Sequence, residues 1–421
     1  MDVYGEFEWR GLIHDATEGA RESLTREKLT GYIGFDPTAP SLHVGSLLVV
    51  MVLAHLQRAG HSPIGLVGGG TGLIGDPSGK TVERQLLTPE RVDENVAGIR
   101  TQVARFLDFD SKTNPARLVN NAEWLTKLGA IDFMRDVGKH FTVNAMLAKE
   151  SVKRRIEGEE GISYTEFSYS LLQAYDFLVL YEKYGCTLQM GGSDQWGNIT
   201  AGMELIRRVR GGKAHGVVMP LVTTAAGTKF GKTEAGAVWL DPALTKPYEF
   251  YQFWLNVDDR DAGRYLRYFT FFDRAQIGEL EAASAREPDR RHAQRALARE
   301  VTRLVHGDGA VRDAESATEK LFKGDLHEMS EAELLAVFSS VPSSEMSHAD
   351  AGWAIAEFLT ANGVVASKGE AARLIRGGGL AVNGQRIADE KARLRPEDAM
   401  HGRYFVVRKG KKDNFLVRLR P

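Results

Sequence analysis

A polar pair stands at the head of an apolar segment. Residues 41–46, Ser-Leu-His-Val-Gly-Ser, begin a run that predicts a helix over residues 41–59. The N–H groups and positive dipole of a helix start favour an anion. Gly45 leaves this turn open to close approach, and His43 and Ser46 add polar side chains beside it. This stretch therefore predicts a polar site at the start of the helix.

A second stretch carries two lysines on a loop of small residues. Residues 223–233 are Thr-Thr-Ala-Ala-Gly-Thr-Lys-Phe-Gly-Lys-Thr, with Gly231 between Lys229 and Lys232. Lysine suits a polyphosphate because its charge sits at the end of a flexible stem. The functional interpretation is a loop that wraps a polyphosphate. The alternative is a solvent-exposed loop whose lysines are incidental.

A buried helix carries three polar side chains on one face. Residues 167–181 are apolar nearly all round, which predicts that this helix is buried. Tyr169, Gln173 and Asp176 are spaced i, i+4 and i+7, so they share one face. Buried polar groups need hydrogen-bond partners. The three residues form either a satisfied structural network or the wall of a pocket for a small polar ligand.

A glycine-rich segment matches two nucleotide-binding motifs incompletely. Residues 70–75 fit the pattern GxGxxG after a predicted strand, but residues 76–79 are Asp-Pro-Ser-Gly where that motif needs a helix. A phosphate loop would need glycine in place of Ile74. A nicotinamide-dependent oxidoreductase is therefore an alternative function that only binding of that cofactor would support. Apart from these motifs, the segment offers a flexible glycine-rich backbone beside two charged residues, Asp76 and Lys80.

The composition is that of a globular protein with more than one domain. The chain has 421 residues, of which 43% are hydrophobic and 26% are charged. The net charge of −2 hides a basic end, because residues 351–421 hold 14 Lys and Arg against 7 Asp and Glu. Such a module indicates a polyanionic partner. A solvated basic tail would have the same composition.

Cysteine content and hydropathy indicate the cellular compartment. Cys186 is the only cysteine, so neither a disulfide within the chain nor a cysteine metal cluster is expected. This fits a reducing cytoplasm. The acidic N-terminus does not resemble a signal peptide, and the longest apolar run, residues 47–54, is too short for a membrane span. We expect a cytoplasmic protein with no membrane partner.

Strands alternate with helices in the first 244 residues. Strands are predicted at residues 31–35, 62–67, 117–120, 187–190 and 217–222, and helices at residues 9–29, 41–59 and from residue 89 onward. This alternation predicts an α/β domain with a Rossmann-like parallel sheet. Ligands of such sheets bind at the carboxyl ends of the strands.

The rest of the chain predicts different elements. Residues 245–338 are helical in pattern, and residues 339–350 form a linker on their Ser and Pro content. Beyond it we expect a small α+β domain. Ser367 begins a capping box for a helix that ends at Arg376, and Asn383-Gly384 predicts a hairpin turn.

In this order, the segments resemble the bacterial tyrosyl-tRNA synthetases over nearly the whole chain. Residues 36–46 are similar to the first signature of class I aminoacyl-tRNA synthetases, and residues 229–233 to the second signature in its tyrosyl variant. Tyr32, Asp76, the polar face described above and residues 191–198 match the tyrosine-binding pattern. Residues 351–421 resemble an RNA-binding domain shared with a ribosomal protein and pseudouridine synthases.

The resemblance implies an activity and a domain organisation. The chain would activate L-tyrosine with ATP to tyrosyl-adenylate and pyrophosphate, then transfer tyrosine to the terminal ribose of its tRNA. Mg²⁺ is expected on the ATP phosphates, with no protein-bound metal. Residues 1–244 would form the catalytic domain, 245–338 a helical tRNA-binding domain and 351–421 an RNA-binding domain. A homodimer is expected, with residues 120–160 near the subunit interface.

The resemblance also implies roles for individual residues. Tyrosine would be bound by Tyr32 and Asp176 at its phenol, by Asp76, Tyr169 and Gln173 at its ammonium group, and by Gln195 at its carboxylate, with Asn121 behind the pocket. The expected catalytic residues on the ATP phosphates are Thr38, His43, Lys229, Lys232 and Thr233. The other expected ATP-binding residues are Asp36, Ser46, Lys80, Arg84, Gly192, Asp194, Leu221 and Val222.

One residue departs from the family pattern. The first signature usually ends in His but here ends in Ser46. Because a serine cannot carry charge, we expect Ser46 to matter less than His43.

Two rival functions are also considered. A tryptophanyl-tRNA synthetase is the nearest rival, and Tyr32 with Asp176 argues against it. A catalytically inactive RNA-binding relative is the other, and the presence of Lys229 argues against it.

Overall fold

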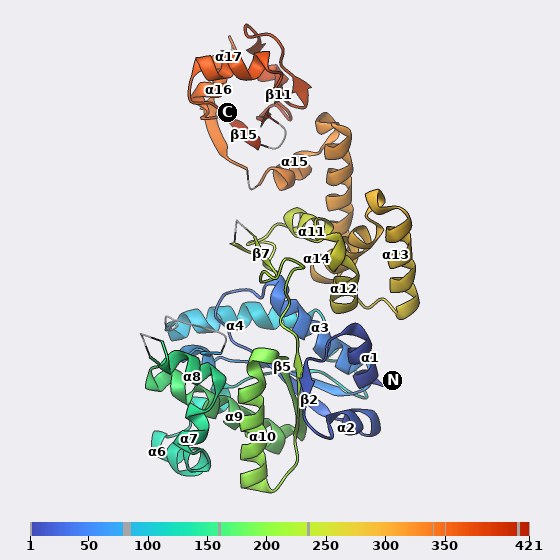
Figure 1. Ribbon diagram of the computed structural model, residues 1–421. Helices are drawn as coiled ribbons and strands as arrows, with labels where there is room; N and C mark the ends of the chain where they lie inside the picture. The colour runs from blue at the N-terminus through green and yellow to red at the C-terminus, as the bar shows by residue number, and fades with distance from the viewer. Residues whose placement is uncertain are drawn as a thin grey trace. The chain divides into compact units, whose positions relative to one another are not determined.

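The structure consists of two compact units. This computed structural model describes residues 2–78, 86–158, 161–233, 236–339, 341–349, 351–410 and 413–420, and the side chains of Glu150, Ser151, Lys232 and Thr233 lie outside the description. The first unit contains Met1–Thr245 and Phe253–Val305, and the second contains Lys246–Gln252 and His306–Pro421 (Figure 1). None of the described helices is long and apolar enough to cross a membrane. The predicted division at residues 244, 338 and 350 stays a prediction.

A six-stranded sheet forms the centre of the first unit. Its strands are β1 (Asp15–Ala16), β2 (Thr30–Phe35), β3 (Ser62–Val67), β4 (Arg117–Asn120), β5 (Cys186–Gly192) and β6 (His215–Met219). Their order is β1-β6-β5-β2-β3-β4, and only β1 is antiparallel to its neighbour. The order reverses between β2 and β5, because β2 continues to β3 on one side while β5 lies on the other. Ligands bind at such a switch point in α/β sheets.

Helices cover both faces of this sheet. On one face, Tyr32, Ile64 and Leu66 share an apolar core with residues of α9 (Tyr164–Tyr184) and α10 (Trp196–Arg210). On the other face, Gly31 and Gly65 bring the sheet close to α3 (Val44–Arg58) and α4 (Pro89–Ala104), because a side chain at either glycine would meet those helices. The predicted Rossmann-like α/β fold is confirmed.

Two predicted elements differ from the structure. The single helix predicted over residues 9–29 is wrong: α1 (Val3–Arg10) and α2 (Ala20–Arg26) flank β1 instead. Gly11 at φ 73° and Gly19 at φ 81° adopt left-handed conformations that interrupt a helix. The strand predicted over 217–222 ends at Met219, because Pro220 has no N–H to donate to a neighbouring strand.

The remaining elements of the first half are short, and those that follow are helical. Between β3 and α9 lie η1 (Thr71–Leu73), α5 (Ala122–Leu125), α6 (Ala130–Asp132), η2 (Phe133–Val137), η3 (Gly138–His140), α7 (Val143–Leu147) and α8 (Glu150–Ile156). After β5 come η4 (Ser193–Gln195), β7 (Lys232–Thr233), β8 (Gly236–Ala237), α11 (Pro247–Leu255), α12 (Asp259–Phe269), α13 (Arg274–Arg286), η5 (Pro288–Arg290) and α14 (His292–Lys323). Gly307 interrupts α14 with φ 87°.

The second unit ends in an α+β domain. After α14 come η6 (Leu326–Glu328), α15 (Glu331–Val337), β9 (Ser343–Ser347), β10 (Trp353–Ala354), α16 (Ile355–Ala361), α17 (Lys368–Arg376), β11 (Leu380–Val382), β12 (Gln385–Arg386), β13 (Arg393–Leu394), η7 (Pro396–Asp398), β14 (Tyr404–Lys409) and β15 (Asp413–Arg420). Its main sheet has the order β12-β11-β14-β15-β9. Phe358, Phe405 and Val407 lie in the apolar core between this sheet and the two helices α16 and α17.

Two local predictions in this domain are confirmed. The Ser367 side chain caps α17 by accepting a hydrogen bond from the Glu370 N–H, and the helix ends at Arg376. Asn383 at φ 49° and Gly384 at φ 81° form the turn between β11 and β12. Part of the segment predicted as a linker is a strand, because β9 pairs in parallel with β15.

Candidate functional site

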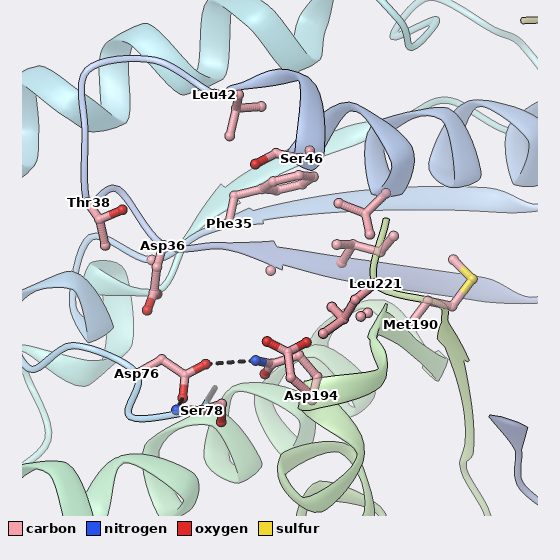
Figure 2. A pocket seen from close by; sticks show the side chains of 18 of the residues that line it. Phe35, Asp36, Thr38, Leu42, Ser46, Asp76, Ser78, Met190, Asp194 and Leu221 are labelled. Atoms are coloured by element: carbon pink, nitrogen blue, oxygen red, sulfur yellow. Dashed lines mark hydrogen bonds between the residues drawn. The ribbon is translucent and has the colours of Figure 1, made fainter. Parts of the chain in front are cut away.

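A cavity of about 660 Å³ opens beside the switch point between β2 and β5. Figure 2 shows Thr38, Leu42 and Ser46 on one side of it and Asp194 with Leu221 across from them. The predicted site residues that line it are Tyr32, Asp36, Thr38, His43, Ser46, Asp76, Asn121, Tyr169, Gln173, Asp176, Gly192, Asp194, Gln195, Leu221, Val222 and Lys229. The fold thus brings these residues from widely separated segments of the sequence to one pocket.

The side chains of four predicted site residues are not described by the structure. Lys80 and Arg84 lie outside the described residues. The backbones of Lys232 and Thr233 form β7, but their side chains are also outside the description. Their predicted contact with the ATP phosphates stays a prediction.

One end of the cavity is a buried carboxylate surrounded by hydrogen-bond donors. Asp176 on α9 is 1% exposed. Its Oδ2 accepts a hydrogen bond from Asn121 Nδ2 at 2.9 Å, and its Oδ1 accepts one from the indole N–H of Trp124 at 2.7 Å. Burial raises the pKa of Asp176 to about 7, and the two hydrogen bonds oppose this rise. The Tyr32 hydroxyl has no hydrogen-bond partner within the described chain although it is buried.

Two further polar groups at this end were not predicted as site residues. Trp124 lies on α5 and reaches Asp176 across the fold. Gln189 lines the cavity from β5 directly beside Tyr32, and its buried Oε1 has no partner among the described residues. Their positions depend on strand pairing and on helix packing between distant segments, so no local sequence signal marks them.

A hydrogen-bonded chain joins the polar face of α9 to the sheet. Asn121 also donates to the hydroxyl of Thr71 at 2.9 Å, and Thr71 donates to Asp36 Oδ1 at 2.9 Å. Asp36 Oδ2 in turn accepts a hydrogen bond from the Tyr169 hydroxyl at 2.8 Å. Asp176 and Tyr169, two turns apart on the same helix face, are thereby held in fixed positions. This face therefore forms the predicted hydrogen-bonded network. The same residues also line the pocket.

A second polar cluster lies at the end of η4. Gln195 Nε2 donates to Asp76 Oδ2 at 2.7 Å, a bond drawn in Figure 2. Gln173 Nε2 donates to Gln195 Oε1 at 3.2 Å. Asn198 Nδ2 lies 3.1 Å from Gln173 Oε1 and 3.3 Å from Ser78 Oγ. Asn198 therefore supports this cluster, and its place in the stretch at residues 191–198 was a signal for it.

The start of α3 explains the spacing of its polar pair. His43 is the N-cap residue, and its Nδ1 accepts a hydrogen bond from the Ser46 N–H at 3.2 Å. Nδ1 is therefore an acceptor, so a neutral His43 ring carries its proton on Nε2 and can donate from there. A side chain at Gly45 would meet the imidazole at 2.9 Å. Gly45 thus makes room for the His43 ring as well as lining the cavity.

The expected free N–H groups of this helix start are partly occupied. The Val44 N–H donates to the Val238 carbonyl at 2.9 Å, and the Ser46 N–H is bound to His43. The explanation that these N–H groups themselves bind the phosphate is therefore too simple. The His43 ring at the helix start is the better-placed donor.

The lysine-bearing loop faces the same cavity. Lys229, Gly227 and Thr223 line it together with Asp194. Burial raises the pKa of Asp194, and the nearby charge of Asp76 raises it further, whereas Lys229 lowers it. Carboxylates and a lysine thus share a partly closed, polar space next to the helix start, which suits a nucleotide's ribose and phosphates.

The donor set does not form a metal site by itself. Among the described residues, no group of three or more His, Cys, Asp or Glu could hold a metal ion. A Mg²⁺ ion bound mainly by phosphate oxygens and water needs no such group.

Comparisons with known proteins identify the family. The profile described as "tRNA synthetases class I (W and Y)" matches residues 24–323, and that of the "Tyrosine--tRNA ligase SYY-like C-terminal domain" matches residues 333–417. The chain is 56% identical over 420 residues to a protein named Tyrosine--tRNA ligase from Roseiflexus castenholzii, covering 99% of both chains. It is 52% identical over 421 residues to the protein of that name from Geobacillus stearothermophilus, covering 99% of this chain and 100% of the relative.

A solved structure agrees with this assignment. A C-terminally truncated mitochondrial tyrosyl-tRNA synthetase from Aspergillus nidulans has a TM-score of 0.70 and 33% identity, covering 76% of this chain and 94% of its own. The sheet order, the pocket and the matched profiles are mutually consistent. The chain therefore belongs to the class I tRNA synthetases of the tryptophanyl and tyrosyl group.

Proposed function

We propose that the chain is a tyrosine–tRNA ligase that first activates tyrosine and then transfers it to tRNA. The relatives that match it from end to end carry this name. The observation that supports the choice of tyrosine is the end of the pocket, where the buried Tyr32 hydroxyl lacks a partner in the described structure and the buried Asp176 carboxylate lines the same cavity. A phenol would satisfy both groups.

The selectivity follows from the cost of unpaired buried groups. Tyrosine would donate its phenol hydrogen to Asp176 and accept one from Tyr32. Phenylalanine would leave both groups without that partner in a buried site, which is costly. A tryptophan ring would offer an N–H but no oxygen to Tyr32. The pocket therefore favours tyrosine over the other aromatic amino acids.

The remaining polar groups would orient the substrate for reaction. Asp76, Tyr169 and Gln173 would hold its ammonium group, and Gln195 would lie beside its carboxylate. The carboxylate attacks the α-phosphorus of ATP, the bond from that phosphorus to the pyrophosphate oxygen breaks, and tyrosyl-adenylate forms. No side chain acts as a covalent nucleophile. The protein contributes positioning and stabilisation of charge on the phosphates.

The other side of the pocket would bind ATP. Asp194 would bind the ribose, Leu221 and Val222 would pack against the adenine, and Gly192 and Asp36 would line this part. The His43 Nε2–H would donate to a phosphate oxygen, with Thr38, Ser46 and Lys229 nearby and Lys80, Arg84, Lys232 and Thr233 completing the set. Mg²⁺ bound to the phosphates would neutralise part of their charge.

We further propose how the chain binds tRNA for the transfer step and how two copies of it form a dimer. The basic residues of 351–421 and the helical region 245–338 would bind tRNA. Its terminal ribose hydroxyl would attack the tyrosyl carbonyl carbon of the adenylate and displace AMP. Six exposed large apolar side chains lie at residues 131–164, and they support a homodimer through that region. We also propose a cytoplasmic location, because ATP, tyrosine and tRNA are all substrates of cytoplasmic protein synthesis.

Amino-acid discrimination tests the proposal. The ratio of kcat/KM for tyrosine to that for phenylalanine would be measured in tRNA charging by the unaltered chain and by Asp176→Ala. We expect a strong preference for tyrosine that the variant loses. Undiminished discrimination in the variant would refute this assignment of the pocket, whatever its overall rate.

A further inference from the structure

Helix α12 holds the base of the loop that carries Lys229. Residues 223–229 form a tight hairpin: Thr223 and Lys229 face each other in an antiparallel bridge, and the Thr224 N–H donates to the Thr228 carbonyl at 2.9 Å. Gly227 closes the turn with φ 78°. The position of the Lys229 ammonium thus depends on how this hairpin is attached to the body of the unit.

Three side chains of α12 bind the first strand of the hairpin. The Thr223 carbonyl accepts hydrogen bonds from Arg264 Nη2 at 2.6 Å and from the Tyr265 hydroxyl at 3.0 Å. The Ala225 N–H donates to Asp261 Oδ2 at 2.8 Å. Asp261 Oδ1 also pairs with Arg264 at 2.5 Å. Asp261 and Tyr265 are 2% and 1% exposed, so two of these three side chains are buried.

An aromatic cluster fixes the other end of the same segment. Phe230 follows Lys229 directly and is 4% exposed. Its ring lies 4.6 Å from the ring of Tyr265 and 5.6 Å from that of Phe269. Tyr265 therefore contacts both ends of the hairpin, through its hydroxyl at Thr223 and its ring at Phe230.

We propose that Asp261, Arg264 and Tyr265 are positioning residues that fix the hairpin carrying Lys229 against the ATP phosphates. Lys229 lines the cavity and lowers the pKa of Asp194, so its charge lies at the nucleotide side of the site. A point charge stabilises a developing negative charge only when it is held in place before the reaction. The inference rests on the proposed function and adds residues outside the pocket to it.

A double-mutant cycle tests this coupling. The rate of tyrosyl-adenylate formation in a single turnover and the Kd for tyrosine would be measured for Arg264→Ala, Tyr265→Phe and Lys229→Ala, and for each α12 change combined with Lys229→Ala. Tyr265→Phe keeps the ring against Phe230 and removes only the hydroxyl. We expect Tyr265→Phe to slow adenylate formation about tenfold, as for loss of one aligned hydrogen bond. Arg264→Ala removes the bonds to both Thr223 and Asp261 and should slow it more, and the Kd for tyrosine should stay unchanged in both variants.

The combined variants separate positioning from general damage. In the Lys229→Ala background the α12 changes should have a much smaller effect, because the main group that they position is gone. Multiplicative rate losses would overturn the inference. So would an equal loss in Arg267→Ala, a matched control on α12 whose side chain pairs with Glu281 instead. No tyrosine-dependent adenylate in the unaltered chain would overturn the proposed function itself.

Discussion

Asp176 combines three structural roles in one side chain. It lies on the polar face of α9, it accepts hydrogen bonds from Asn121 and Trp124, and it lines the cavity beside Tyr32. Full burial favours its neutral form, while the two donors favour its ionised form. The carboxylate is therefore poised between the two forms, and substrate binding is sensitive to which one is present.

This balance predicts a pH dependence of tyrosine binding. The pKa of Asp176 is raised to about 7, and an ionised acceptor makes the stronger bond with a phenol. Tyrosine affinity, measured by calorimetry, should therefore rise as the pH increases through about 7. Because the folded-state pKa lies above the unfolded value, the carboxyl stabilises the fold most below about pH 4. That contribution is lost as the pH rises through about 7.

A substitution at Trp124 provides the control for this prediction. Trp124→Phe removes the indole N–H from Asp176, a bond that lowers the pKa of the carboxyl. The midpoint of the affinity profile should therefore move to higher pH. In Asp176→Asn the profile should become flat. A wild-type profile that is already flat between pH 6 and 8 would contradict the assignment of the dependence to Asp176.

At the residue scale, the sequence predicts the parts of the site that follow a local spacing. Tyr169, Gln173 and Asp176 could be found because helical periodicity places them on one face. Trp124 and Gln189 could not, since they meet the site only through packing between α5 and α9 and through the register of β5 beside β2. Long-range pairing of this kind leaves no period in a single sequence.

At the scale of elements, Arg10 joins the first helix to the end of α12. Its guanidinium donates to the carbonyls of Arg267, Thr270 and Phe272 at 2.8, 3.0 and 2.8 Å, and it pairs with Glu6. The Arg10 side chain is 2% exposed. These carbonyls are at and just beyond the helix end, where no backbone donor is available within the helix.

Removal of Arg10 should destabilise the protein. Arg10→Ala leaves three carbonyls and part of an ion pair without their donor, so we expect the free energy of unfolding to fall by about 3 kcal/mol. Urea denaturation would measure this. Arg21→Ala breaks an exposed pair with Glu8 and should cost less than about 1 kcal/mol. Equal losses in the two variants would argue against a special role for Arg10.

Helix and strand positions could be predicted where the sequence has clear N-cap residues and a clear alternation of strand and helix patterns. Ser367 caps α17 and α4 begins at Pro89, as the sequence predicted. The helix expected over residues 9–29 failed because its apolar spacing continues through Gly11 and Gly19, whose conformation a spacing pattern does not reveal. Local propensity was overruled there by the pairing of β1 with β6.

At the scale of the whole molecule, an exposed apolar region predicts association. The apolar side chains are Ile131, Met134, Val143, Leu147, Ile156 and Tyr164, each more than 40% exposed. In Figure 1, α6, α7 and α8, which carry most of them or adjoin them, lie at the same side of the first unit. Such a region is unusual on the surface of a monomer.

Sedimentation would test this association. We expect the unaltered chain to sediment as a dimer and the double substitution Ile131→Glu, Met134→Glu to sediment as a monomer. Leu244→Glu changes an apolar side chain that is 48% exposed elsewhere in the first unit, and it should leave the dimer intact. A monomeric unaltered chain at micromolar concentration would contradict the proposal.

The basic part of the second unit, residues 351–421, is expected to bind tRNA and to play no part in adenylate formation. Arg373 and Arg418 are exposed on α17 and β15, so Arg373→Glu with Arg418→Glu should weaken phosphate contacts without disturbing the core. tRNA charging should slow and become less dependent on salt, while adenylate formation stays unchanged. Arg91→Glu with Arg100→Glu on α4, where both side chains are exposed, serves as the charge-matched control. Charging at the normal rate would refute a role for these residues.

The pocket should activate tyrosine and no other amino acid. Amino-acid-dependent exchange of labelled pyrophosphate into ATP, without tRNA, measures that step directly for each of the twenty amino acids. We expect exchange with tyrosine alone. Exchange with tryptophan, or with none of the twenty, would contradict the assignment of the pocket to tyrosine.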